Sequence, residues 1–193
     1  MISSPRYTAF LDACVLYPAV VRDVLLSFAA ESMYKVAWSA EVHDEWTRNL
    51  LLNRPDLTAE QLNRTVNAMN SAFPDAQIEN YHMLLSSLIL PDDDDRHVLA
   101  AAIRCKAAVI VTTNLRDFPI DIVSQWNIEI QHPDDFLSSQ FELNPRLGNE
   151  AVRKILKRLK NPPVSKKELI ERYQELSLPK FALVLHRSFW PLR

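Results

Sequence analysis

The sequence predicts a three-layer α/β fold, in which a central parallel sheet has helices on both faces, with a small helical region at the C-terminal end. Two observations support this prediction. Short apolar runs with the composition of buried strands recur along the chain, and amphipathic helical patterns lie between them. Strands that alternate with helices form parallel sheets, because each helix carries the chain back across a face of the sheet.

The predicted strands are short runs rich in β-branched and aromatic residues. Residues 7–11 form one run that ends at Asp12, and residues 108–112 read AVIVT. A further short strand is expected at residues 127–130. Continuous apolar runs of this length are typical of strands that are buried on both faces.

The predicted helices follow the 3.6-residue spacing of apolar side chains. Thr58 and Gln61 have the pattern of a capping box, which marks the start of a helix. The predicted helices cover residues 20–33, 40–52, 59–73, 95–105 and 133–141.

A break is expected at residues 143–150, which include Pro145 and the only glycine of the chain, Gly148. Because these residues interrupt regular structure, we place a linker or a subdomain boundary there. The predicted domains are therefore residues 1–142 and an extension at residues 143–193.

The extension is expected to be helical and basic. A helix at residues 149–160 precedes two prolines, and Ser165 with Glu168 has the capping pattern of another helix. Residues 151–193 hold 11 Lys and Arg against 3 Asp and Glu, a balance of +8, so the first 150 residues have a balance of −10. A basic helix of this kind suits phosphate binding, and Arg153 and Lys157 are candidate contacts. A solvated amphipathic helix and a site for a partner protein are the alternatives.

Composition excludes several classes of protein. A single glycine rules out the glycine-rich loops that hold dinucleotides or nucleoside triphosphates. Cys14 and Cys105 lack neighbours at metal-binding spacing, so neither a zinc site nor a disulfide framework is expected. The apolar runs are too short for a membrane span, and residues 1–7 lack the features of a signal peptide. We expect a cytoplasmic protein.

Four acids stand where a site is expected. Asp12 directly follows the first strand, and Asp117 lies a few residues after the strand at 108–112. Because the carboxyl ends of parallel strands share one edge of a sheet, these acids should converge. Asp95 begins a helix that opens onto the same edge, and Glu45 lies inside the helix at 40–52, flanked by inward-packing Val42 and Trp46.

Carboxylates that gather in one place repel one another unless a cation neutralises them. An all-oxygen set favours a hard ion such as Mg²⁺ or Mn²⁺. A metal site of this kind suits the hydrolysis of a phosphodiester without a protein nucleophile. Each acid also has a simpler interpretation: Asp95 or Asp12 as a cap, Glu45 as a surface residue, and Asp117 as part of a turn. Their joint placement favours the site.

Four stretches together resemble the PIN-domain family, particularly the VapC-like toxins of bacterial toxin–antitoxin systems. Their order and separations are similar to the family across residues 7–140, and the last two stretches are the more specific. The stretches are FLDACVLYP at 10–18, WSAEVHDEW at 38–46, DRHVLAAA at 95–102 and IVTTNLRDFP at 110–119.

The resemblance implies a metal-dependent endoribonuclease that uses Mg²⁺ or Mn²⁺, cuts RNA and is restrained by a cognate antitoxin. It gives the positions of the family's acidic quartet to Asp12, Glu45, Asp95 and Asp117, with Asp12 and Asp95 as direct metal ligands. The oligomeric state stays open, with a homodimer as one alternative. Thr113 and Asn114 match polar positions of the family, and Arg116 is a further candidate for contact with RNA.

Two departures from the family leave another function open. Cys14 stands where the family commonly has Asn, and residues 106–107 lack the usual glycine. A cysteine at that position weakens an orienting hydrogen bond, so the alternative is a PIN-like module of reduced activity that binds RNA or protein. A phosphatase with an aspartate nucleophile ranks last, because it needs a second Asp where Cys14 stands.

Overall fold

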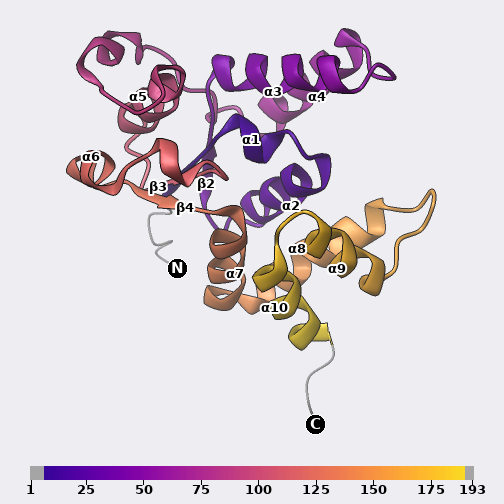
Figure 1. Cartoon of the computed structure of the whole chain (residues 1–193). Helices are drawn as coiled ribbons and strands as arrows, with labels where there is room; N and C mark the ends of the chain where they lie inside the picture. The colour runs from indigo at the N-terminus through magenta and orange to yellow at the C-terminus, as the bar shows by residue number, and fades with distance from the viewer. Residues whose placement is uncertain (1–6, 190–193) are drawn as a thin grey trace. The chain divides into compact units, whose positions relative to one another are not determined.

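The computed structural model describes residues 7–189 (Figure 1). Residues 1–6, most of the stretch in which no signal peptide is expected, and residues 190–193, the end of the predicted extension, lie outside the described part. The chain divides into two compact units: Met1–Tyr17 with Lys35–Gln131, and Pro18–Tyr34 with His132–Arg193.

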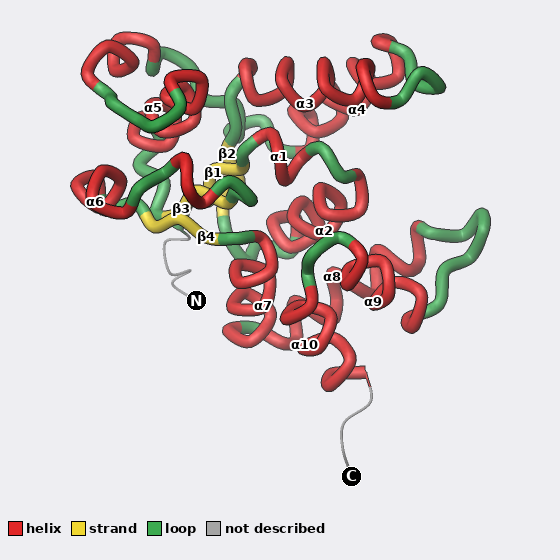
Figure 2. Tube along the Cα trace, in the orientation of Figure 1, coloured by secondary structure: helices red, strands yellow, loops and turns green. Residues whose placement is uncertain are grey.

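The first unit contains a sheet of four parallel strands (Figure 2). The strands are β1 (Thr8–Leu11), β2 (Lys35–Ala37), β3 (Val109–Val111) and β4 (Glu129–Gln131), in the order β2-β1-β3-β4. The parallel sheet and the many helices confirm the predicted α/β class. Strand β2 was not predicted from the sequence, and β4 begins two residues later than expected.

The register of the two central strands positions the site. Ala9, Phe10 and Leu11 of β1 are fully buried, as are the side chains of β3, because helices and neighbouring strands cover them. Leu11 pairs with Val111, so the residues that follow, Asp12 and Thr112, emerge side by side.

Helix α3 (Ala40–Asn53) presents one apolar face to the core and an acidic face beside it. Val42, Trp46 and Leu50, spaced four residues apart, are buried, and burial of each such side chain stabilises the fold by roughly 2 kcal/mol. Ser39 caps the helix by accepting a hydrogen bond from the Val42 N–H at 3.2 Å. Glu41 and Glu45 share the neighbouring face and remain partly exposed.

The other helical elements of the first unit are mostly short. The predicted capping box of Thr58 and Gln61 is confirmed at the start of α4. The helices are α1 (Ala13–Leu16), α4 (Ala59–Ala72), α5 (Arg96–Arg104) and α6 (Ile120–Val123), and the 3-10 turns are η1 (His82–Ser87), η2 (Asp93–Asp95), η3 (Leu115–Asp117) and η4 (Ser124–Trp126).

The second unit is entirely helical in its described part. Its helices are α2 (Ala19–Ala30), α7 (Pro133–Leu143), α8 (Pro145–Arg158), α9 (Lys166–Glu175) and α10 (Pro179–Phe189). Phe28 of α2 meets Phe181 of α10 edge to face, with ring centroids 5.7 Å apart. The buried carboxylate of Asp134 accepts the backbone N–H groups of Lys180 and Phe181, which satisfies the start of α10. A helical C-terminal region is thus confirmed, although α10 was not predicted.

The predicted linker at residues 143–150 is wrong. Helix α7 ends at Leu143, Asn144 caps the next helix, and α8 begins at Pro145. Proline fits the first turn of a helix, where its missing N–H has no partner to lose. Gly148 lies within α8, where a Cβ atom would stand 2.5 Å from the Phe141 ring, so the glycine permits close packing rather than flexibility. The domain boundary at residue 143 stays a prediction.

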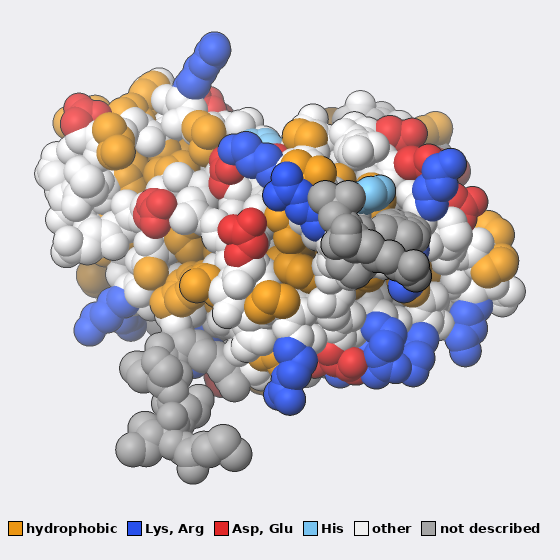
Figure 3. All heavy atoms as spheres, turned by 90° about the horizontal axis from the view of Figure 1, so that it is seen from below, with side chains coloured by type: hydrophobic (Ala, Val, Ile, Leu, Met, Phe, Trp, Pro, Cys, Tyr) orange, Lys and Arg blue, Asp and Glu red, His pale blue; other side chains and the backbone are white. Residues whose placement is uncertain are grey.

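Within residues 7–189, no helix has both the length and the apolar character needed to cross a membrane. Figure 3 shows that several Lys and Arg side chains have Asp or Glu side chains beside them.

Candidate active site

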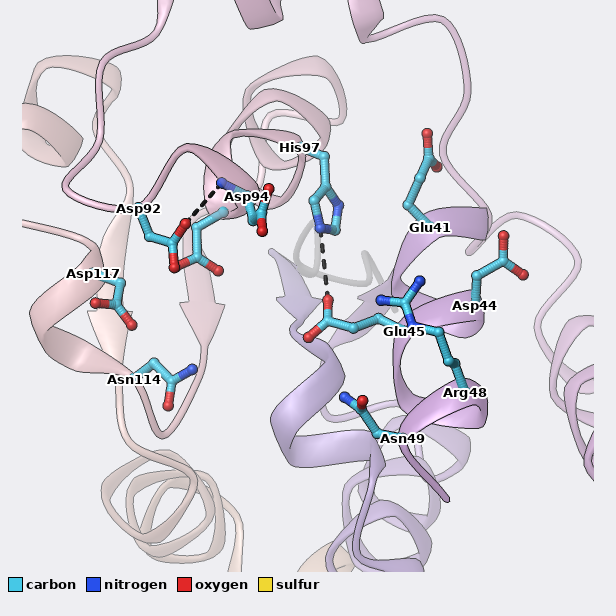
Figure 4. Close-up of a pocket in the computed structure, with 11 residues that line it drawn as sticks. Glu41, Asp44, Glu45, Arg48, Asn49, Asp92, Asp94, His97, Asn114 and Asp117 are labelled. Atoms are coloured by element: carbon cyan, nitrogen blue, oxygen red, sulfur yellow. Dashed lines mark hydrogen bonds and ion pairs between the residues drawn. The ribbon is translucent and has the colours of Figure 1, made fainter. Parts of the chain in front are cut away.

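A cavity of about 610 Å³ in the first unit collects acidic side chains from the carboxyl edge of the sheet. Figure 4 shows Asp117 and Asn114 on one side, Glu45 and Asn49 of α3 on the other, and His97 reaching toward Glu45. The lining residues are Glu41, Asp44, Glu45, Arg48, Asn49, Asp92, Asp94, Asp95, His97, Asn114 and Asp117.

Asp12 lies buried between the strand ends, with 3% of its surface exposed. Its carboxylate accepts three hydrogen bonds: from the Ala13 N–H at 2.6 Å, from the Thr112 hydroxyl at 2.7 Å and from the Cys14 thiol at 3.1 Å. Burial raises the pKa of Asp12, and the negative charge of Glu45 raises it further, while these hydrogen bonds lower it. The net effect is a raised pKa, so the ionised form of Asp12 is disfavoured when no cation is bound.

The loop after β3 is tied to Asp12 through two side chains. The Asn114 N–H donates to the Thr112 hydroxyl oxygen at 2.9 Å, and that hydroxyl donates to Asp12. The Thr113 N–H donates to the Cys14 sulfur at 3.2 Å. The segment that carries Asn114 and Asp117 is therefore fixed with respect to Asp12.

Cys14 contacts the carboxylate that it was expected to orient poorly. Its thiol donates to Asp12 and lies 3.3 Å from the Thr112 hydroxyl. Burial, followed by the neighbouring charge of Asp12, raises the pKa of this thiol to about 12, so it stays protonated and able to donate at neutral pH. A thiol is a weak donor, yet the contact itself is present.

Asp95 is the last residue of the turn η2, directly before α5. The charges of all three other acids of the predicted quartet affect its pKa. Its pKa is raised to about 7, first by partial burial and then by the charges of Asp12, Asp117 and, more weakly, Glu45. The charges of Asp12, Asp117, Asp92 and Glu45 therefore all act on Asp95, in that order of strength.

His97 faces Glu45 across the cavity, with its Nε2 atom 3.7 Å from the Glu45 Oε2 atom. Its other ring nitrogen, Nδ1, is buried and has no hydrogen-bond partner among the described residues. The imidazole of His97 therefore faces one acid of the predicted quartet.

The predicted substrate-binding residues are not all found together. Asn114 lines the acidic cavity, and Thr113 is exposed on the same loop. Arg116 instead lines a separate cavity of about 730 Å³ beside Phe118 and Ile120. Arg153 and Lys157 belong to α8 of the second unit.

Sequence reasoning missed several residues around the acids. Thr112 is fully buried, and its hydroxyl donates a hydrogen bond to Asp12. The pairing of Leu11 with Val111 would have shown that these two residues lie side by side. The helical spacing of Arg48 and Asn49 after Glu45 on α3 likewise indicated a shared face. The other acids that the sequence analysis did not assign to the cavity are Glu41, Asp44, Asp92 and Asp94.

The donor set fits a hard divalent cation in chemical type. It consists of carboxylate oxygens. Burial, followed by the repulsion of neighbouring acids, raises the pKa of Asp12 and Asp95, and a bound cation would favour their ionised forms. As the side chains of residues 7–189 are placed, no three His, Cys, Asp or Glu residues form a coordinating group.

Two family models match different parts of the chain. A family model described as "PIN domain" matches residues 8–116, which include Asp12, Glu45 and Asp95 and stop one residue before Asp117. A model described as "VapC50 C-terminal domain" matches residues 133–187.

A protein named "Putative ribonuclease VapC50" from Mycobacterium tuberculosis is 40% identical to the chain over 95 residues. The alignment covers 49% of this chain and 56% of that protein, so the chain spans about half the length of the relative it matches. No solved structure matches the chain.

Proposed function

The chain belongs to the PIN-domain family, and from this premise we propose that it is a Mg²⁺- or Mn²⁺-dependent endoribonuclease that hydrolyses RNA phosphodiester bonds. The observation that carries the proposal is that Glu45, Asp95 and Asp117 line one acidic cavity, and that burial, followed by nearby charges of which Asp12 is the first, raises the pKa of Asp95 to about 7. The name of the relative supports the same reaction.

In this proposal the four acids hold the cation, with Asp12 and Asp95 as its direct ligands. Such an ion, when bound, acidifies a water molecule and neutralises charge on the scissile phosphate. The hydrogen bonds from Ala13, Thr112 and Cys14 hold the Asp12 carboxylate in one orientation before the ion arrives.

The polar side chains at the cavity position the RNA. Asn114, with Thr113 beside it, offers donors next to Asp117, and Arg48 and Asn49 offer donors beside Glu45. Donors of this kind orient a phosphate or a ribose without reading the base sequence. An acidic cavity repels RNA when it is empty, so these donors act together with the neutralising ion.

The proposal extends to the biological setting. The similarity to a VapC protein favours a toxin that acts in the cytoplasm and is restrained by a cognate antitoxin, with RNA as substrate and a homodimer as a possible assembly. The alternative of a weakened RNA- or protein-binding module rested on Cys14. The hydrogen bond from Cys14 to Asp12 argues for an intact site.

The test is RNA cleavage by the purified chain, free of any bound antitoxin, with Mg²⁺ or Mn²⁺. Asp95→Asn keeps the size of the side chain and removes one charge, so cleavage should fall by at least about a hundredfold. Asp93→Asn is the matched control, since Asp93 lies in the same turn but does not line the cavity.

Equal cleavage by the wild type and the Asp95→Asn variant would assign the activity to other residues or to a contaminant. If the wild type cleaves no RNA with either ion, the binding module becomes the better description. Cys14→Asn then shows whether the thiol silences the site, because restored cleavage would identify the lost amide as the cause.

A further inference from the structure

Much of the positive charge on α8 is already matched within the second unit. An acid beside each of three cations cancels much of the local positive potential that a phosphate would otherwise meet. The pairs are Arg153 with Glu150, Lys154 with Glu31, and Arg158 with Asp23. The predicted contact Arg153 is therefore a weaker candidate for phosphate binding than its place on a basic helix indicated.

A separate cavity gathers three basic side chains, of which Arg158 is paired with Asp23. It measures about 390 Å³ and lies where α8 passes into the loop before α9. None of its lining residues is Asp or Glu, and within the described part of the chain no acid lies within 4 Å of the side-chain nitrogens of Lys160 or Arg172. The lining residues are Arg158, Leu159, Lys160, Asn161, Pro162, Val164 and Arg172.

Hydrogen bonds and ion pairs hold the walls of this cavity. Arg158 donates to Asp23 and to the Ser27 hydroxyl, both at 2.8 Å, which fixes one end of its guanidinium group. The loop closes on itself through a bridge between Lys160 and Pro163. The three cations are thus carried by defined backbone, which limits the conformational entropy lost when an anion binds.

One acid of α9 at helical spacing from Arg172 takes part in the helix cap. Glu168 lies one turn before Arg172, and Arg172 contributes to the lowered pKa of this acid. Its carboxylate accepts the Ser165 N–H at 2.7 Å as part of the capping box, and this contact is the largest cause of the lowered pKa. Arg172 keeps its positive charge toward the cavity, because Glu168 does not line it.

We propose that Lys160 and Arg172, in the cavity beside Arg158, bind a backbone phosphate of RNA. Guanidinium groups bind two phosphate oxygens at once, and an ammonium group adds a compact charge. The setting supports an RNA ligand, because this part of the chain has the +8 charge balance. The choice of RNA as the source of the phosphate rests on the proposed function.

The test measures the binding of a labelled single-stranded RNA to the full chain, in EDTA, over a range of salt concentrations. The variant Lys160→Gln with Arg172→Gln removes two charges from the cavity. The matched control, Arg153→Gln with Lys167→Gln, removes the same charge from α8 and α9 outside it. Because each phosphate contact to a single strand contributes about 0.7 to the salt slope and the cavity holds one phosphate, the cavity variant should lower the slope by about 0.7 and weaken binding about tenfold at physiological salt.

The control variant should change the slope by less than half as much. Equal losses in the two variants, or an unchanged slope in the cavity variant, would overturn the proposal. Lys160→Gln alone provides a second test if the double variant unfolds, since Lys160 is exposed and its single loss should give about half the effect. Thermal unfolding of each variant identifies a folding defect.

Competition separates the possible sources of the anion. RNA should displace the labelled strand, whereas inorganic phosphate should act only weakly. If a polyglutamate peptide competes as well as RNA does, the cavity binds acidic protein and the RNA assignment fails. A wild type that binds no RNA overturns the cavity as an RNA site.

Cleavage with Mn²⁺, measured in parallel, keeps the two proposals apart. If the chain binds RNA through the cavity but cleaves no RNA, the proposed nuclease activity is wrong and the proposed phosphate site is retained. A chain that cleaves, and whose cavity variant binds RNA unchanged, refutes the cavity alone.

Discussion

The carboxylate of Asp12 is subject to opposing effects. Burial disfavours its charge, while a backbone N–H, a hydroxyl and a thiol donate to it and favour the charge. A carboxylate that accepts three hydrogen bonds keeps one orientation. A bound cation offsets the free-energy cost of keeping this buried group ionised. The same interactions therefore explain both the geometry of the residue and its affinity for metal in the proposed site.

Asp95 gives the metal-free protein a pH-dependent stability of defined sign. Its pKa in the folded chain, about 7, lies above the ordinary value of 3.8. The folded state then binds more protons than the unfolded state between these values, so the contribution of Asp95 to stability is fully present below about pH 4 and is lost as the pH rises through about 7. We expect the free energy of unfolding, measured with urea in EDTA, to decrease across this window.

The Asp95→Asn variant tests whether Asp95, rather than another acid of the chain, causes this pH dependence of stability. Its free energy of unfolding should depend less on pH over the same window, because the amide does not titrate. Asp93→Asn should keep the slope of the wild type, since Asp93 is well exposed and pairs with Arg96 at the surface. A slope that is equally steep in the Asp95→Asn variant contradicts the raised pKa of Asp95.

Sequence reasoning at this scale located the acids better than their surroundings. The edge rule for parallel strands predicts that Asp12 and Asp117 lie at one edge of the sheet, and the charges of both act on Asp95. Thr112 was missed because a threonine at the end of a β-branched run looks like one more strand residue. Only the register, in which Leu11 pairs with Val111, shows that its hydroxyl meets Asp12.

At the scale of elements, Gly148 tests how closely α7 and α8 pack. In Gly148→Ala, the new Cβ atom would stand 2.5 Å from a carbon of the buried Phe141 ring, so the ring or the helix must shift. Overpacking of this kind costs about 1–3 kcal/mol, and the better helix propensity of alanine returns roughly 1 kcal/mol. We expect a net loss of about 1 kcal/mol in the free energy of unfolding by urea.

A control on the same helix distinguishes packing from propensity. Lys157→Ala changes an exposed position of α8 and should alter stability by less than about 0.5 kcal/mol. A Gly148→Ala protein as stable as the wild type, or more stable, would show that Phe141 moves aside without cost, and the packing role of the glycine would be wrong.

The elements that sequence reasoning misread share a physical cause. Strand β2 has three residues, shorter than the run needed for a recognisable strand pattern, and it exists because it pairs with β1. Pro145 and Gly148 were interpreted as breakers, yet a proline at the start of a helix and a glycine at a close contact belong to α8. In both cases the structure depends on contacts with distant parts of the chain, and the local spacing of residues does not show these contacts.

At the scale of the whole molecule, the two compact units do not follow the order of the chain. Helix α2, which follows shortly after Asp12 in the sequence, packs with α8 and α9 in the second unit. The sequence assigned α2 to residues 1–142, because helical periodicity shows which face of a helix is buried but not which partner buries it.

A chain truncated after Glu142 should therefore fail to fold as the full chain does. It keeps α2 but loses α8, α9 and α10, so the buried side chains of Val24, Leu25 and Phe28 lose partners, including the Phe181 ring. Exposing three such side chains costs roughly 4–9 kcal/mol, which is comparable to the total stability of a domain. We expect the truncated chain to bind a hydrophobic dye and to unfold without the cooperative transition of the full chain. Residues 143–189, added as a separate peptide, should restore that transition, whereas a truncated chain with the full free energy of unfolding would show that α2 is stable without these helices.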